Sequence, residues 1–165
     1  MKMLMSLVTS AVLLLVPAAS LAQGSADAAK APYDAQLAQS LGADNHGMRP
    51  YVLVILKTGP TPVPAGAERD EMFKGHFANM NRLSAEGVLA LAGPLDGVDG
   101  WRGLFILAVP DIEAARKHVG TDPVVLKGEM VAEYHKYYGS AALMLVPETH
   151  AKIAKEKSEV VPASG

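Results

Sequence analysis

Short apolar runs, separated by turn residues, divide the middle of the chain into predicted strands. Four of the runs have strand length: residues 51–56, 88–92, 104–109 and 130–138. The first, YVLVIL, is apolar throughout and lies between Pro50 and Gly59-Pro60, which is typical of a central strand buried on both faces. A fifth apolar run, residues 141–146, is expected to extend the last strand or to form an additional edge strand.

Two helices are predicted between these strands. The first has an apolar residue at every third or fourth position between Phe73 and Leu83, and it ends at Gly87. The second begins after Asp111, a common N-cap residue, and ends at Gly120. The resulting order, β-α-β-β-α-β, predicts an α+β fold of the ferredoxin-like type. In this sandwich a four-stranded antiparallel sheet carries both helices on one face.

The second face of the predicted sheet has no element to cover it. An open face formed by strands this apolar is an aggregation hazard, and a second copy of the chain is the simplest cover for it. We therefore expect a homodimer that forms through the open sheet face.

The first 22 residues have the pattern of a cleavable secretory signal. Lys2 gives a positive start, residues 4–16 are mostly apolar, and Ser20-Leu21-Ala22 offers small residues for cleavage after Ala22. An uncleaved anchor is the alternative, but the apolar run is shorter than the roughly 20 residues that span a bilayer. We expect a secreted or periplasmic protein with no membrane attachment after cleavage.

Segments with few bulky apolar residues flank the predicted domain. Residues 23–49 are expected to be a flexible linker with one weak helix over residues 35–41, and residues 148–165 to be a polar C-terminal tail. Within that tail, residues 152–159 are charged enough for a solvated helix. The folded domain is thus predicted at residues 50–147.

The composition excludes several classes of function. The formal net charge is −2, without the clusters of Lys and Arg that indicate nucleic-acid binding. The chain has no cysteine, which excludes disulfides, thiolate chemistry and cysteine-based metal sites. It has no Ser-His-Asp chain motif, phosphate-cradling glycine loop or cofactor fingerprint, so no cofactor is predicted.

His76 is the candidate for proton-transfer chemistry. It lies at the margin of the first helix's apolar face, and Asp122 is a carboxylate that would fix its tautomer if the two residues meet. Structural interpretations compete with this one. A histidine at such a margin is more often a hydrogen-bonded core residue, and Asp122 followed by Pro123 is typical of a helix N-cap. Capping and pairing do not exclude each other, and the sequence leaves both open.

The other four histidines are weaker candidates. They are His46, His118, His135 and His150. None shows paired ligand spacing, such as two histidines four positions apart on a helix. No metal site is predicted.

Four short motifs occur in a fixed order along the chain. They are the helical His76, then Leu83 with Gly87, the strand end Ala92-Gly93-Pro94, and Asp122-Pro123. As an ordered set they resemble the YCII-related family, over roughly residues 50–138. The resemblance implies two ferredoxin-like units packed sheet to sheet as a dimeric α/β barrel. It also implies an active-site dyad of His76 and Asp122. Some family members act as dehydrochlorinases on aromatic catabolites, and more distant dimeric α/β barrels bind haem through a lone histidine, which leaves haem as a minor alternative.

Four further residues are predicted at the pocket or in its motifs: Gly93, Pro94, Trp101 and Tyr134. Each has a structural alternative. Gly93-Pro94 is typical of a strand end, and single aromatic residues in strands more often serve packing.

Two hypotheses follow for the function. The first is an exported, cofactor-independent lyase, isomerase or hydrolase in which His76 moves a proton on a small organic substrate and Asp122 orients the imidazole. The second is a non-catalytic module that binds a small ligand or serves assembly, with His76 as a structural group. Solvent access to His76 discriminates between them, because a proton-transfer residue must meet its substrate.

Overall fold

The computed structural model describes residues 32–155. The predicted signal at residues 1–22, the first part of the linker and the end of the tail lie outside this range. In chain order, the elements are α1 (Ala35–Ser40), β1 (Met48–Thr58), α2 (Ala67–Ala85), β2 (Leu89–Pro94), η1 (Val98–Gly100), β3 (Trp101–Leu107), α3 (Ile112–Val119), α4 (Pro123–Leu126), β4 (Met130–Ser140), η2 (Ala141–Leu145) and α5 (Val146–Ile153). Within the described range, no helix is both long enough and apolar enough to cross a bilayer.

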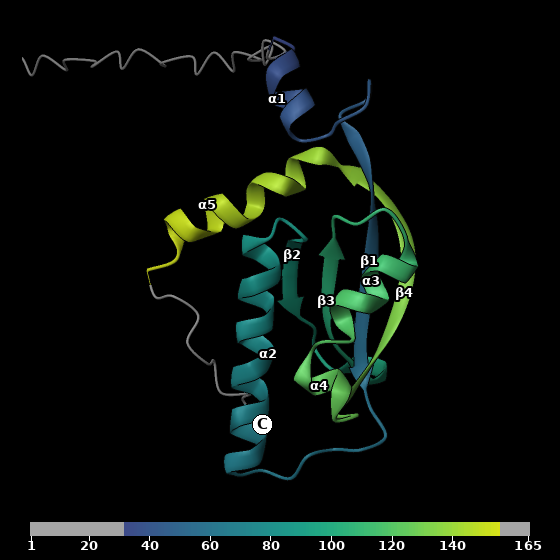
Figure 1. The fold of residues 1–165 in the computed structure, drawn as a ribbon, viewed down its shortest axis with the longest axis vertical. Coiled ribbons are helices and arrows are strands. Elements are labelled where there is room, and N and C mark those ends of the chain that lie inside the picture. The colour runs from purple at the N-terminus through teal and green to yellow at the C-terminus, as the bar shows by residue number, and fades with distance from the viewer. Residues whose placement is uncertain (1–31, 156–165) are drawn as a thin grey trace, which may run out of the picture. The chain divides into compact units, whose positions relative to one another are not determined.

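The four strands form one antiparallel sheet in the order β2-β3-β1-β4 (Figure 1). β1 lies in the centre, where Val54 is opposite Phe105 of β3 and Tyr134 of β4. This order and the alternation of strands and helices confirm the predicted α+β, ferredoxin-like arrangement.

β1 is longer than the run of apolar residues that predicted it. It pairs with β4 from Met48 to Thr58, whereas its pairing with β3 begins only at Val52. Pro50, predicted to bound the strand, lies inside it, in the part that has a single neighbouring strand. A proline is tolerated there because its missing N–H is not needed on the unpaired side.

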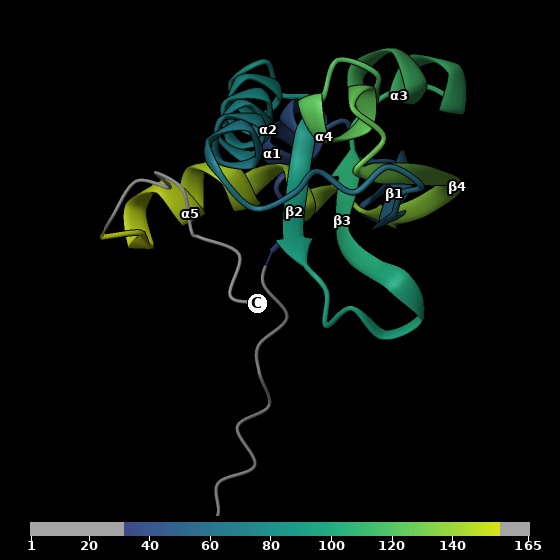
Figure 2. The same ribbon diagram turned by 90° about the horizontal axis from the view of Figure 1, so that it is seen from below.

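The main hydrophobic core fills the space between the sheet and three helices. β1 directs Val52, Val54 and Leu56 to this side, and none of them is more than 2% exposed. Met72 and Leu83 of α2 join the same cluster. The other buried members are Leu89, Phe105, Leu107, Val109, Ala115, Val119, Val124 and Met130. Figure 2 shows α2 and α3, the two predicted helices, on the same face of the sheet, together with the short helix α4.

The opposite face of the sheet carries a second apolar cluster. Its buried members are Tyr51, Ala90 and Ile106. Leu143 and Met144 of η2 pack against it, so this face is partly covered by the chain itself. The half-buried side chains of the cluster include Leu53, Leu91 and Leu104. The homodimer through this face stays a prediction.

The prediction of a strand over residues 141–146 is wrong. The chain instead forms the 3₁₀ helix η2 and continues into α5. The Ser140 side chain accepts a hydrogen bond from the backbone N–H of Ala142 at 3.2 Å, which turns the chain out of β4. Pro147, in the first turn of α5, favours a helix start and cannot donate to a strand ladder.

Candidate functional site

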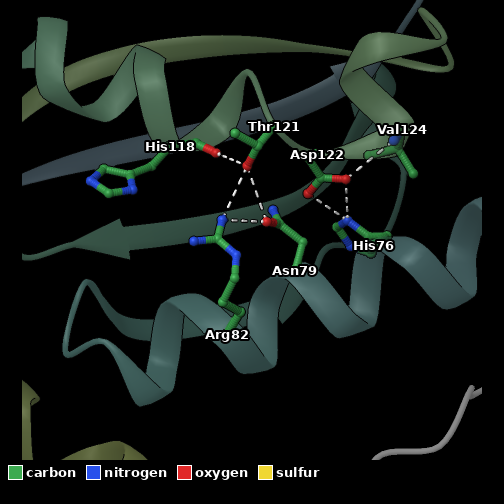
Figure 3. Close-up of polar contacts among 7 residues, drawn as sticks. All are labelled: His76, Asn79, Arg82, His118, Thr121, Asp122 and Val124. Atoms are coloured by element: carbon green, nitrogen blue, oxygen red, sulfur yellow. Dashed lines mark hydrogen bonds and ion pairs between the residues drawn. The ribbon is translucent and has the colours of Figure 1, made fainter.

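The imidazole of His76 and the carboxylate of Asp122 face each other between α2 and the turn that precedes α4 (Figure 3). His76 Nδ1 lies 2.9 Å from Oδ1 and 2.8 Å from Oδ2 of Asp122. Both residues are buried, His76 with 8% and Asp122 with 0% of its surface exposed. The structure therefore brings together the two candidate residues of the sequence, 46 positions apart.

Local structure explains why Asp122 lies at this point. Its backbone is extended, its side chain accepts the backbone N–H of Val124 at 3.1 Å, and Pro123 begins α4. The N-cap interpretation of Asp122-Pro123 is confirmed by this geometry. The same carboxylate serves as helix cap and as partner of His76.

The contact with Asp122 also determines which nitrogen of His76 is available. A carboxylate only accepts hydrogen bonds, so Nδ1 carries the proton that it donates to Asp122. In the neutral ring, Nε2 then keeps a lone pair. Among the residues that the structure describes, none forms a hydrogen bond with Nε2. Nε2 is the atom that can exchange a proton with a bound molecule.

Three phenylalanine rings surround the imidazole. Phe73 and Phe77 of α2 contact it edge-on, with ring centroids 6.2 Å and 5.3 Å away, and Phe105 of β3 stacks on it at 6.0 Å. An apolar surrounding strengthens the hydrogen bond to Asp122, since fewer water molecules compete for it.

A second polar cluster lies one turn further along α2. Oδ1 of Asn79 accepts hydrogen bonds from Nη2 of Arg82 at 2.8 Å and from Oγ1 of Thr121 at 3.1 Å. Nη2 of Arg82 lies 3.2 Å from Thr121 Oγ1, which is also 2.7 Å from the carbonyl oxygen of His118. Asn79 is 9% exposed, and within residues 32–155 its Nδ2 has no hydrogen-bond partner. Figure 3 shows this cluster beside the pair of His76 and Asp122.

A buried ion pair lies at the start of β4, in a different contact network. Glu129, 2% exposed, accepts hydrogen bonds from Arg69 Nη1 and from the backbone N–H of Val63, both at 2.7 Å. Nη1 of Arg102 lies 3.7 Å from the same carboxylate. These contacts tie the proline-containing loop and the first turn of α2 to the sheet, so their role is structural.

The four residues predicted at the pocket lie at other places in the sheet. Gly93 is half-buried in β2 and Pro94 is exposed at its end. Trp101 begins β3, opposite Lys57, with 42% of its surface exposed. Tyr134 packs against the main core under the guanidinium of Arg116, whose carbon lies 4.4 Å from the ring centroid. Burial raises the pKa of the Tyr134 phenol, while the Arg116 charge lowers it. Their role in ligand binding stays a prediction.

A groove of about 210 Å³ lies between α2, β2 and α5. Its walls are mostly apolar, and its polar side chains are Asn81, Ser84 and His150. His76 is not among its lining residues. In the described part of the chain, no three His, Cys, Asp or Glu side chains come together as a metal site.

The family model of the YCII-related domain matches residues 50–135, more than half of the chain. The chain belongs to the YCII-related domain family. The YCII-related part runs from β1 into β4 and contains both His76 and Asp122. α1, η2 and α5 lie outside it. No curated protein matches the chain.

Sequence reasoning missed three residues around the site. Asn79 follows His76 by three positions, which places it on the same helix face, and this spacing was the available signal. Thr121 directly precedes Asp122 and so had to lie nearby. Phe105 had no comparable signal, because its contact with His76 depends on how α2 crosses the sheet.

Proposed function

We propose that this YCII-related protein is an exported, cofactor-independent acid/base enzyme. In this proposal His76 is the general acid/base and Asp122 orients it, on a small organic substrate. The observation that supports it is the asymmetry of the imidazole: Nδ1 is held by both oxygens of Asp122, and Nε2 has no partner in the described part of the chain. A base whose second nitrogen is held by a carboxylate is the arrangement that proton transfer by histidine needs.

The proposed chemistry runs through Nε2. In an elimination, Nε2 accepts a proton from the carbon adjacent to the carbon that bears the leaving group. The C–H electron pair becomes the new double bond and the leaving group departs with its own electrons. The imidazolium that forms is stabilised by Asp122, because its Nδ1–H already points at the carboxylate. An isomerisation uses the same first step and returns the proton to another carbon.

A binding or assembly role is the second candidate, and the burial of His76 favours it. With 8% of its surface exposed, His76 presents little of its ring to a substrate. In this alternative the imidazole is a buried hydrogen-bonding group that ties α2 to the turn before α4. A ligand would then bind elsewhere, and the groove beside α5 is the candidate place.

A substrate screen with three proteins separates these candidates. Chlorinated and unchlorinated lactones are the first substrates, with wild type, His76→Asn and His150→Ala. His76→Asn keeps an N–H donor for Asp122 and removes Nε2, so the fold is retained while the base is lost. We expect turnover by wild type and by His150→Ala, and a loss of about 10²- to 10⁴-fold in His76→Asn.

Three results would contradict the proposal. Unchanged turnover by His76→Asn would show that the imidazole is not the base. Loss of turnover in His150→Ala alone would place the chemistry in the groove beside α5. Ligand binding without turnover in all three proteins would support the binding module.

A further inference from the structure

α2 and the turn before α4 are joined by two sets of side-chain hydrogen bonds, of which the pair of His76 and Asp122 is only one. The second consists of Asn79, Arg82 and Thr121. Figure 3 shows the two sets next to each other, with α2 on one side and the turn on the other. Consecutive residues of the turn therefore contact α2 at positions three apart.

The spacing of the two sets matches along the helix. His76 and Asn79 are about 4.5 Å apart along the axis of α2, since a helix rises about 1.5 Å per residue. Thr121 and Asp122 are consecutive, so their Cα atoms are about 3.8 Å apart. The turn thus runs alongside α2 in a register that lets both contacts form together. With Asp122 alone, a short shift of the turn along α2 would move the carboxylate off Nδ1.

The hydrogen bonds of the second set fix its geometry. Oδ1 of Asn79 accepts a hydrogen bond from Arg82 Nη2, which determines how the amide is oriented, and it lies 3.1 Å from Thr121 Oγ1. The single hydroxyl proton of Thr121 is shared between Asn79 Oδ1 and the carbonyl oxygen of His118, 2.7 Å away, and the hydroxyl oxygen accepts from Arg82 Nη2 at 3.2 Å. Its Nδ2 is buried and unpaired within residues 32–155, which is unfavourable. Among the described residues, Asn79 therefore contributes through its acceptor. The acceptor holds Thr121, the neighbour of Asp122.

We propose that Asn79 and Thr121 form a positioning pair that holds the Asp122 carboxylate on Nδ1 of His76. The catalytic importance of this pair rests on the proposed acid/base function, whereas its effect on the geometry of Asp122 and His76 does not. Asn79 and Thr121 act through Asp122. In this role the pair keeps His76 in the tautomer with the proton on Nδ1.

The experiment observes the Nδ1–H proton of His76 by NMR in the full-length chain, without any substrate. Thr121→Val removes the hydroxyl at constant shape, Thr121→Ser keeps it, and Thr149→Val is the matched control on α5. We expect exchange of the Nδ1–H proton with water to speed up about tenfold in Thr121→Val. Thr121→Ser and Thr149→Val are expected to keep the wild-type exchange rate. Nitrogen shifts of the ring report whether the Nδ1–H tautomer is retained.

The exchange rate in Thr121→Val decides whether Thr121 positions Asp122. Wild-type exchange and tautomer in Thr121→Val, with only a lower unfolding free energy, would overturn the proposal and make Thr121 a cap of the last α3 carbonyls. Asn79→Leu provides a second test, and it is expected to speed up exchange at least as much as Thr121→Val. This readout needs no turnover. Failure of the enzymatic proposal, seen as unchanged turnover in His76→Asn, is therefore distinguishable from failure of the positioning pair.

Discussion

Oδ1 of Asp122 lies 2.9 Å from Nδ1 of His76 and at the same time accepts the backbone N–H of Val124, at 3.1 Å. One buried oxygen atom thus caps the N-terminus of α4 and accepts a hydrogen bond from the imidazole of His76 on α2. Here the cap and the pair share a residue, so substitutions of Asp122 report on both.

Substitutions of Asp122 are predicted to separate the two roles. Asp122→Ala loses the cap and the charged partner of His76, and we expect the free energy of unfolding to fall by about 3 kcal/mol. Asp122→Asn keeps Oδ1 as the acceptor for Val124, but it removes the charge and replaces Oδ2, 2.8 Å from Nδ1, with an NH2 donor. It is therefore expected to cost less than Asp122→Ala but more than the charge alone. Asp111→Ala is the matched control. It caps α3 at an exposed position and should cost about 1 kcal/mol. Urea unfolding measures all three, and equal costs for Asp122→Ala and Asp111→Ala would contradict a stabilising contact with His76.

The ion pair of Glu129 with Arg69 is predicted to be important for stability because one partner is buried. Glu129→Ala removes the acceptor of the Val63 N–H and the charged partner of Arg69, whose Nη1 keeps its hydrogen bond to the Val63 carbonyl oxygen. We expect a loss of about 3 kcal/mol. The control is Glu133→Ala, which breaks an exposed pair with Lys57 and should change little. Thermal unfolding of both variants checks the difference. Similar melting temperatures for the two variants would show that the buried pair has no special weight.

Tyr134 is predicted to link stability to alkaline pH. Burial raises the pKa of its phenol, so the folded state favours the protonated form. The contribution to stability is therefore complete below the ordinary tyrosine pKa of about 10 and is lost as the pH rises through the folded pKa. A titration of phenolate absorbance in wild type and Tyr134→Phe isolates this group. A difference titration at or below the ordinary value would contradict the prediction.

We propose that the second face of the sheet forms a homodimer, and one residue tests it. Leu104 is half-buried in the apolar cluster of that face. Leu104→Lys places a charge in the proposed interface and should shift the protein from dimer to monomer. Val98→Lys is the control, since Val98 is 63% exposed on η1. Multi-angle light scattering gives the mass of each protein, and a monomeric wild type at micromolar concentration would exclude the dimer.

Several features follow from the sequence because they depend on neighbouring residues. The apolar run of β1, the helical spacing from Phe73 to Leu83 and the cap Asp122-Pro123 are patterns of local periodicity and local hydrogen bonding. The order of these elements then limits the fold to few arrangements, and the ferredoxin-like one is observed. The wrong prediction of a strand over residues 141–146 also concerns local structure. The hydrogen bond from the Ala142 N–H to the Ser140 hydroxyl begins a 3₁₀ helix there, in spite of the strand propensity of the apolar run.

The site itself depends on tertiary structure. His76 and Asp122 were both candidates, but their 2.8 Å contact exists only because α2 and the turn before α4 pack on the same face of one sheet. The contact of Phe105 with the imidazole has the same origin, as does the buried Nδ2 of Asn79, which has no partner within residues 32–155. Local patterns determine which residues form a helix or a strand. They carry no information on the distance between two side chains 46 positions apart, because packing of the whole core sets that distance.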